Sequence, residues 1–169
     1  MAIRTILHYP DPRLRNKGLL IEAVTPDLLV LIDDMAETMY AAPGVGLAAT
    51  QIGEPCALFL IDIAGEDEPS DLRVFINPEI LERVGDQTWE EGCLSFPGVT
   101  EEIKRAARVK VKALDKSGKP FELEAEGLLA VAVQHEYDHL EGMLMIDHVG
   151  PLKKRIMAKK VQKHAQKRK

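Results

Sequence analysis

Residues 128–141 read Leu-Leu-Ala-Val-Ala-Val-Gln-His-Glu-Tyr-Asp-His-Leu-Glu and form the most informative segment of the chain. The first half is apolar on every side, which predicts a helix buried in the middle of the protein. Gly142 follows as a residue that can end this helix. His135 and His139 are one helical turn apart, so both imidazoles lie on one face and can reach a single cation.

Glu136 follows the first histidine and points about 100° away around the helix, beside such a cation rather than at it. A carboxylate placed there can take a proton from a metal-bound water, as in other H-E-x-x-H sites. The alternative is two buried, hydrogen-bonded histidines with an exposed glutamate. A catalytic site also needs a third ligand from elsewhere in the chain, and the candidates are Cys93, His148, His8, Asp147 and Glu141.

Cys93 lies in the segment Glu-Gly-Cys-Leu-Ser-Phe-Pro-Gly, residues 91–98, whose glycines and proline favour irregular backbone. A thiolate is a good ligand for zinc or ferrous iron, and Cys/His sites with an open position are typically catalytic. The alternative is a small buried hydrophobe, which is the interpretation we prefer for Cys56.

Residues 44–53, Gly-Val-Gly-Leu-Ala-Ala-Thr-Gln-Ile-Gly, would let a substrate lie close to the backbone. Within this segment, Gln51 carries an amide donor that could face a developing oxyanion. The alternative is a surface turn between a helix and a strand.

The flanking sequence predicts an α+β fold, with antiparallel sheets packed around the buried H-E-x-x-H helix. Thr25 and Pro26 suit the start of an N-terminal helix that ends at Pro43-Gly44. Its apolar stripe leaves Asp34 on the outer side. Strands are expected at 56–62 and 74–76, with a polar loop at 66–71 between them and the second strand ending at Asn77-Pro78. Residues 109–113 and 121–125 are expected to form a hairpin. A helix is expected after Pro151, with a narrow apolar stripe of Leu152, Ile156 and Val161.

Composition is that of an ordinary globular protein, and 169 residues predict a single domain, 1–169. Two cysteines cannot build a disulfide framework, and no secretory signal or membrane-length apolar run is present. We therefore expect a cytoplasmic protein. Aromatic residues make up only 5%, which argues against a base-stacking nucleic-acid platform, and we expect neither a membrane nor a DNA partner.

Charge is distributed unevenly along the chain, whose net charge is −5. Residues 151–169 contain 9 lysines and arginines and no acidic residue, so the rest of the chain carries −14. An acidic body with a basic C-terminal helix suggests two separate roles.

Three segments together resemble the peptide deformylase family, which removes the N-formyl group from nascent chains. The family patterns G-x-G-L-A-A-x-Q, E-G-C-L-S and H-E-x-x-H match residues 44–51, 91–95 and 135–139 in the same order. The likeness extends over the whole chain, from Tyr9-Pro10-Asp11-Pro12 to the hairpin before the metal helix.

This resemblance implies a role for each matching residue. Cys93, His135 and His139 would hold one divalent metal ion, with Fe2+ expected and Zn2+, Ni2+ or Co2+ as substitutes. Glu136 would be general base and then general acid, while the Gln51 amide and the Leu94 N–H stabilise the oxyanion. The implied substrate-binding residues are Val45, Gly46, Trp89, Glu91, Gly92, Val131 and Ala132, with Leu94 also near the methionine pocket. Glu91 and Gln134 would support the ligands, and Asp138 would pair with Arg105.

The implied substrates are formyl-Met nascent peptides, and the basic helix could contact ribosomal RNA through phosphate attraction. A solvated helix with a frayed end is the alternative for that segment. For the whole chain, one alternative function is a zinc peptidase, which leaves residues 44–51 and a cysteine ligand unexplained. The other is a non-enzymatic metal-binding or ribosome-associated protein, which leaves Glu136 without a purpose.

Overall fold

The protein is described here from a computed structural model, which covers residues 2–65 and 67–167. Met1, Glu66 of the expected polar loop, and the basic residues Arg168 and Lys169 lie outside the described residues. The helical elements of the described chain are η1 (Pro12–Arg15), α1 (Pro26–Ala41), η2 (Ala49–Ile52), α2 (Gly127–Leu140), η3 (Met145–His148) and α3 (Pro151–Lys167).

The strands form two antiparallel sheets, as the α+β prediction requires. The larger has the order β1-β2-β3-β6-β7, and the smaller pairs β4 with β5. Their bounds are β1 (Gly46–Ala48), β2 (Leu58–Ile61), β3 (Arg73–Val84), β4 (Gln87–Gly92), β5 (Thr100–Arg105), β6 (Arg108–Leu114) and β7 (Pro120–Glu126).

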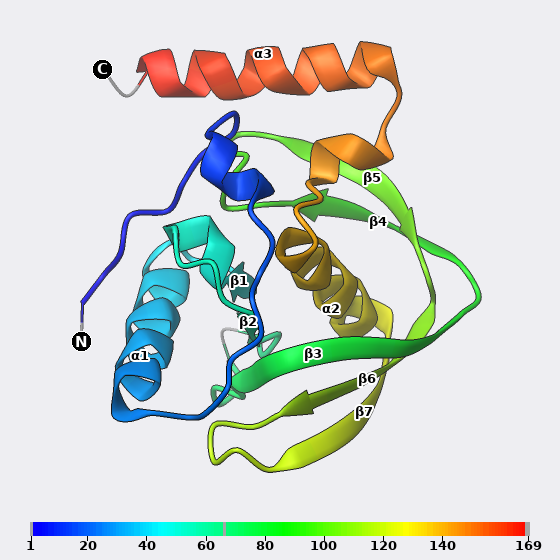
Figure 1. The fold of residues 1–169 in the computed structure, drawn as a ribbon. Coiled ribbons are helices and arrows are strands. Elements are labelled where there is room, and N and C mark those ends of the chain that lie inside the picture. The colour runs from blue at the N-terminus through cyan, green and yellow to red at the C-terminus, as the bar shows by residue number, and fades with distance from the viewer. Residues whose placement is uncertain (1, 66, 168–169) are drawn as a thin grey trace.

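Helix α2 lies in the middle of the molecule, between the larger sheet and the β4–β5 pair (Figure 1). Residues 130–136 and 138–140 are buried, which confirms the prediction of a central helix that is covered on nearly all sides. Ala130 and Val133 pack with Phe59 and Phe75 of the larger sheet in one core cluster. Gly142, with a φ of 76°, follows the helix end as expected, and a side chain there would meet the Arg15 carbonyl oxygen at 2.7 Å.

Helix α1 begins and ends close to the predicted positions. The Thr25 hydroxyl accepts the Leu28 N–H at 3.2 Å and caps the first turn. The expectation that Asp34 lies off the buried stripe is wrong, because this residue is only 4% exposed. Its carboxylate accepts hydrogen bonds from the Ala2 N–H and the Arg4 guanidinium, which fasten the N-terminal segment across α1.

The prediction that a strand ends at Asn77-Pro78 is also wrong. Strand β3 continues to Val84, and a register shift against β6 between Ile76 and Glu79 accommodates the proline, which has no N–H to donate. Asn77 adopts a φ of 51°, and its side-chain amide exchanges two 2.8 Å hydrogen bonds with the Ile21 backbone. The sequence Asn77-Pro78, which is typical of a turn, thus forms a bulge inside a longer strand.

The hairpin of β6 and β7 has the predicted alternation, with Lys112 directly opposite Glu122 and Lys110 opposite Glu124. The apolar stripe predicted for the C-terminal helix is partly wrong. Leu152 and Ile156 are exposed on α3, whereas Met157 and Val161 pack into a core cluster with Phe96 and Val99. Among residues 2–65 and 67–167, no helix is long and apolar enough to cross a membrane.

Candidate active site

One face of α2 and the segment after β4 bring three potential metal ligands together. Cys93, His135 and His139 each offer a ligand atom, and the three atoms lie within 4.8 Å of one another. The Cys93 sulfur is 3.4 Å from His139 Nε2. Both histidines are buried, and Cys93 and His135 line a cavity, so the cluster is not a surface patch.

The electrostatics of this cluster favour a cation. Burial lowers the pKa of His139 well below its usual value, so its imidazole is neutral, as a metal ligand must be. Burial acts in the same direction on His135, but the Cys93 thiol and the Glu91 carboxylate together raise its pKa well above the usual value. One sulfur and two imidazole nitrogens meeting at a single point are ligands that zinc and ferrous iron accept, so the donor set fits a metal site.

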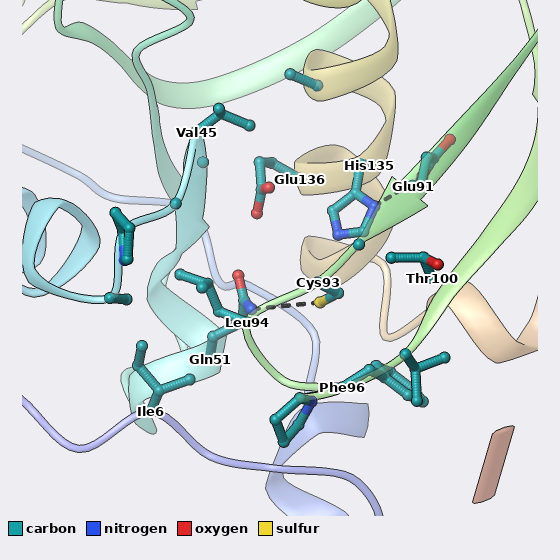
Figure 2. A pocket seen from close by; sticks show the side chains of 18 of the residues that line it. Ile6, Val45, Gln51, Glu91, Cys93, Leu94, Phe96, Thr100, His135 and Glu136 are labelled. Atoms are coloured by element: carbon teal, nitrogen blue, oxygen red, sulfur yellow. Dashed lines mark hydrogen bonds and ion pairs between the residues drawn. The ribbon is translucent and has the colours of Figure 1, made fainter. Parts of the chain in front are cut away.

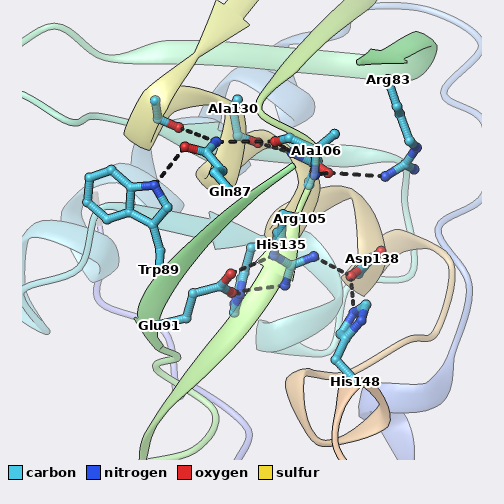
Figure 3. A network of polar contacts seen from close by, with 12 residues as sticks. Arg83, Gln87, Trp89, Glu91, Arg105, Ala106, Ala130, His135, Asp138 and His148 are labelled. Atoms are coloured by element: carbon cyan, nitrogen blue, oxygen red, sulfur yellow. Dashed lines mark hydrogen bonds and ion pairs between the residues drawn. The ribbon is translucent and has the colours of Figure 1, made fainter. Parts of the chain in front are cut away.

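A buried network of charged groups contacts the Nδ1 side of the His135 ring (Figure 3). Its Nδ1 lies 3.0 Å from Glu91 Oε1, which leaves Nε2 for the cavity. Arg105 donates to both Glu91 oxygens at 2.6 and 2.9 Å, and to Asp138 at 2.8 Å. His148 Nε2 lies 2.7 Å from the same Asp138 oxygen. The predicted Asp138–Arg105 pair is therefore confirmed, and Glu91 is turned toward protein groups.

Glu136 projects from α2 into the cavity between Val45 and Leu94 (Figure 2). It is 4% exposed, and its Oε1 has no hydrogen-bond partner within the described part of the chain. Burial raises the pKa of Glu136 to about 7. Gly46 of β1 lies against this carboxylate, because a side chain built on Gly46 would meet Glu136 Oε2 at 2.5 Å.

The segment of residues 44–53 is not a surface turn, since residues 46–51 are buried as β1 and η2. Gln51 Oε1 accepts the Ala48 N–H at 2.9 Å, which turns the amide nitrogen toward Cys93, 3.7 Å from its sulfur. The Leu94 N–H follows Cys93 in a tight turn and makes no hydrogen bond among the described residues. The Gln51 amide nitrogen therefore points at the Cys93 sulfur (Figure 2).

The cavity beside these groups has a volume of about 800 Å³. Strands β1 and β4 both border it, and among residues 2–65 and 67–167 each is hydrogen-bonded to only one other strand. Trp89, on β4, is 38% exposed and donates from Nε1 to Gln87 Oε1 at 2.8 Å. All the expected substrate-binding residues line this cavity, namely Val45, Gly46, Trp89, Glu91, Gly92, Val131 and Ala132.

Other candidates lie outside the cluster of potential ligands. Asp147 pairs with Arg15, and His148 pairs with Asp138. In the described part of the chain, Asp147, His148, His8 and Glu141 do not belong to the group of potential ligands. Gln134 bonds the Ala106 backbone through its oxygen and nitrogen, both at 3.0 Å, so it anchors the end of β5 rather than a histidine.

Sequence analysis did not single out Ser95, which is completely buried and accepts a hydrogen bond from Gln51 Nε2 at 3.0 Å. The two residues in this contact are 44 positions apart, so no local sequence pattern predicts it. Sequence analysis also did not assign β4 and β5 as strands. Glu90 faces Glu102, and Glu91 faces Glu101, across this pair, and opposed like charges are atypical of paired strands.

Comparisons with known proteins agree with this geometry. The family model described as polypeptide deformylase matches residues 3–155. A peptide deformylase from Alkalilimnicola ehrlichii is 51% identical over 163 residues, covering 96% of this chain and 91% of the relative. One from Phenylobacterium zucineum is 52% identical over 166 residues, covering 98% of each chain.

Solved structures are similar over nearly the whole length. The crystal structure of a peptide deformylase from Legionella pneumophila is 47% identical, with a TM-score of 0.94 over 99% of this chain and 98% of that one. A peptide deformylase from Ehrlichia chaffeensis, solved in complex with actinonin, is 34% identical, with a TM-score of 0.92 over 97% of this chain and 98% of that one.

Proposed function

The chain belongs to the polypeptide deformylase family, whose members remove the formyl group from an N-terminal methionine, and we propose that it does so with a divalent metal ion. The observation that carries this proposal is the convergence of Cys93, His135 and His139, two of which line the cavity together with Glu136. Fe2+ is the proposed ion, with Zn2+, Ni2+ or Co2+ as substitutes, because thiolate and imidazole ligands accept all four.

The bound ion would supply Lewis-acid chemistry, lowering the pKa of a water molecule and polarising the formyl carbonyl. Glu136 would take the proton from the attacking water. Burial raises the pKa of this carboxyl, which favours its holding that proton and then passing it to the leaving amine. The products are formate and a peptide with a free N-terminus.

The Gln51 amide and the Leu94 N–H would stabilise the formyl oxygen as negative charge develops on it. The Gln51 amide is already oriented toward the cysteine, so little reorganisation of this donor would accompany the reaction. Glu91, held by Arg105, would fix the orientation of His135 by bonding its Nδ1.

The peptide would lie in the cavity as an extended chain between the unpaired edges of β1 and β4. Backbone groups of Val45, Gly46, Glu91 and Gly92 border this path. Its methionine side chain would enter the apolar part, lined by Val131, Ala132 and Trp89. Pairing through the backbone needs no particular sequence beyond the first residue.

Helix α3 is proposed to attract ribosomal RNA. Lys154, Arg155, Lys159, Lys160 and Lys163 are all exposed along it. Ribosome pelleting should fall as salt rises and after deletion of residues 153–169. Pelleting that is insensitive to both would refute this contact. A cytoplasmic location and a single domain spanning 1–169, with 151–169 as its basic C-terminal helix, complete the proposal.

Formate release from a formyl-Met-Ala-Ser peptide tests the function, with anaerobically purified protein whose metal content is measured on the same sample. Rapid release with about one metal per chain is expected. A metal-loaded protein that cleaves internal peptide bonds instead would indicate a peptidase. A loaded protein that does neither would indicate a non-catalytic member of the family.

A further inference from the structure

The Gln51 side chain is held at both ends of its amide. Oε1 accepts the Ala48 N–H at 2.9 Å, and Nε2 donates to Ser95 Oγ at 3.0 Å. Gln51 is 1% exposed and Ser95 is completely buried, so water does not compete for these bonds. The planar amide nitrogen has two hydrogens, and one of them is donated to Ser95. The other hydrogen points toward Cys93.

The backbones of the same two residues are tied to one N-terminal segment. The Leu7 N–H donates to the Gln51 carbonyl at 2.7 Å, and the Tyr9 N–H donates to the Ser95 carbonyl at 2.8 Å. The Tyr9 ring stacks on Phe96, with centroids 5.0 Å apart. The turn that carries Leu94 and Ser95 is therefore joined to η2 through its side chain and through its backbone.

We propose that Ser95 is a positioning residue for the reaction, and that with the Leu7–Tyr9 backbone it holds the Gln51 amide at a set position relative to the Leu94 N–H. This inference rests on the proposed function, in which those two donors receive the developing negative charge. Ser95 itself touches no reacting atom. Its hydroxyl acts by fixing the rotation of the Gln51 amide about its last side-chain bond.

Removal of the hydroxyl has a defined consequence. In Ser95→Ala, the Gln51 N–H loses its acceptor inside a dry site, where an unpaired donor is unfavourable. The Cys93 sulfur, already 3.7 Å away, is the nearest alternative acceptor. Rotation toward that sulfur withdraws the amide from the position of the oxyanion. We expect kcat to fall about tenfold, with KM nearly unchanged, because the interaction lost is one made in the transition state.

A double-mutant cycle distinguishes positioning from general packing. Ser95→Ala is measured in the parent chain and again in Gln51→Ala, with kcat and KM from formate release. The loss of kcat should appear only where Gln51 is present, and Ser95→Thr, which keeps the hydroxyl, should recover most of it. Ile32→Val, a truncation in the core of α1, serves as the control for reduced stability and should leave kcat unchanged. Equal losses in both backgrounds, or no loss in the parent, would overturn the proposal.

A second measurement does not depend on turnover. The side-chain amide protons of Gln51 in zinc-loaded, nitrogen-15-labelled protein are assigned through Gln51→Ala. They should exchange slowly with solvent in the parent and much faster in Ser95→Ala. Unchanged exchange would overturn the proposal even if the chain released no formate, whereas absent formate release alone would count only against the function.

Discussion

Replacing Gly46 by alanine should disable the general base without touching a metal ligand. The added methyl group would stand 2.5 Å from Glu136 Oε2, 3.0 Å from Cδ and 3.1 Å from Cγ. Ordinary contact begins at 3.4 Å, so the carboxylate must retreat by about 1 Å. Glu136 lines the cavity, so its side chain can make room for the methyl group only by turning away from Gly46 and leaving the position it holds beside Cys93 and His135.

The size of the effect follows from that displacement. A misplacement of about 1 Å at a reacting group costs on the order of 100-fold in rate. This corresponds to about 2.7 kcal/mol in the activation free energy. The added methyl group also overpacks the site, which should lower the free energy of unfolding by about 1–3 kcal/mol. The folded fraction should stay high, because native domains are usually stable by about 5–15 kcal/mol.

The assay is kcat for formate release from a formyl-Met peptide, together with metal content and a urea unfolding curve on the same preparation. Gly150→Ala is the matched control, because nothing lies within 4 Å of the position its methyl group would take. Gly46→Ala should hold its metal and lose turnover, while Gly150→Ala should keep both. A kcat within threefold of the parent would refute the argument that Gly46 sets the position of the carboxylate.

Three further predictions concern the same site. Glu136→Ala should retain about one metal per chain and lose about 100-fold to 10,000-fold in kcat; near-normal turnover would exclude it as the base. Arg105→Met leaves Glu91 and Asp138 buried without their cation and should destabilise the fold by about 3–5 kcal/mol in urea unfolding at pH 7. Burial opposes ionisation of both carboxyls, but their hydrogen bonds and ion pairs hold each pKa below the usual value. The ion pairs therefore stabilise the parent protein above the pKa that these carboxyls have in the unfolded chain, and this stabilisation is lost as the pH falls through their pKa in the folded protein. The free energies of unfolding of parent and variant should then converge in acid. A difference in free energy of unfolding that stays constant with pH would contradict this. Trp89→Ala should widen the apolar part of the cavity and change KM more than kcat for formyl peptides whose first side chain is bulkier than methionine, and unchanged kinetics would remove Trp89 from the substrate path.

Local patterns were sufficient for the elements whose residues interact mainly with their sequence neighbours. Thr25 caps α1 through a residue three positions away, and the β6–β7 hairpin alternates as its own residues dictate. Asn77-Pro78 misled the prediction because the bulge in β3 depends on Ile21, 56 residues away. Asp34 was misplaced for the same kind of reason, since its burial depends on Arg4 and Ala2.

The candidate site divides along the same line. His135 and His139 share one helix face with Glu136 beside it, so their spacing alone predicted a metal site. Spacing left five candidates for the third ligand, and the choice of Cys93 needed the family resemblance. The Ser95–Gln51 contact and the approach of Gly46 to Glu136 each join separate elements. Neither contact could be predicted from the spacing of residues within one helix or strand.

The unpaired strands at the cavity have a consequence for solubility as well as for recognition. An exposed strand edge invites another sheet to dock, and this is a common route to aggregation. Here β1 is 3 residues long and β4 is 6, and both edges border the cavity. Edges this short offer little backbone to a second sheet, whereas a single extended chain needs only a few residues to pair with them. The same short edges that could receive a peptide therefore limit pairing between folded copies of the protein.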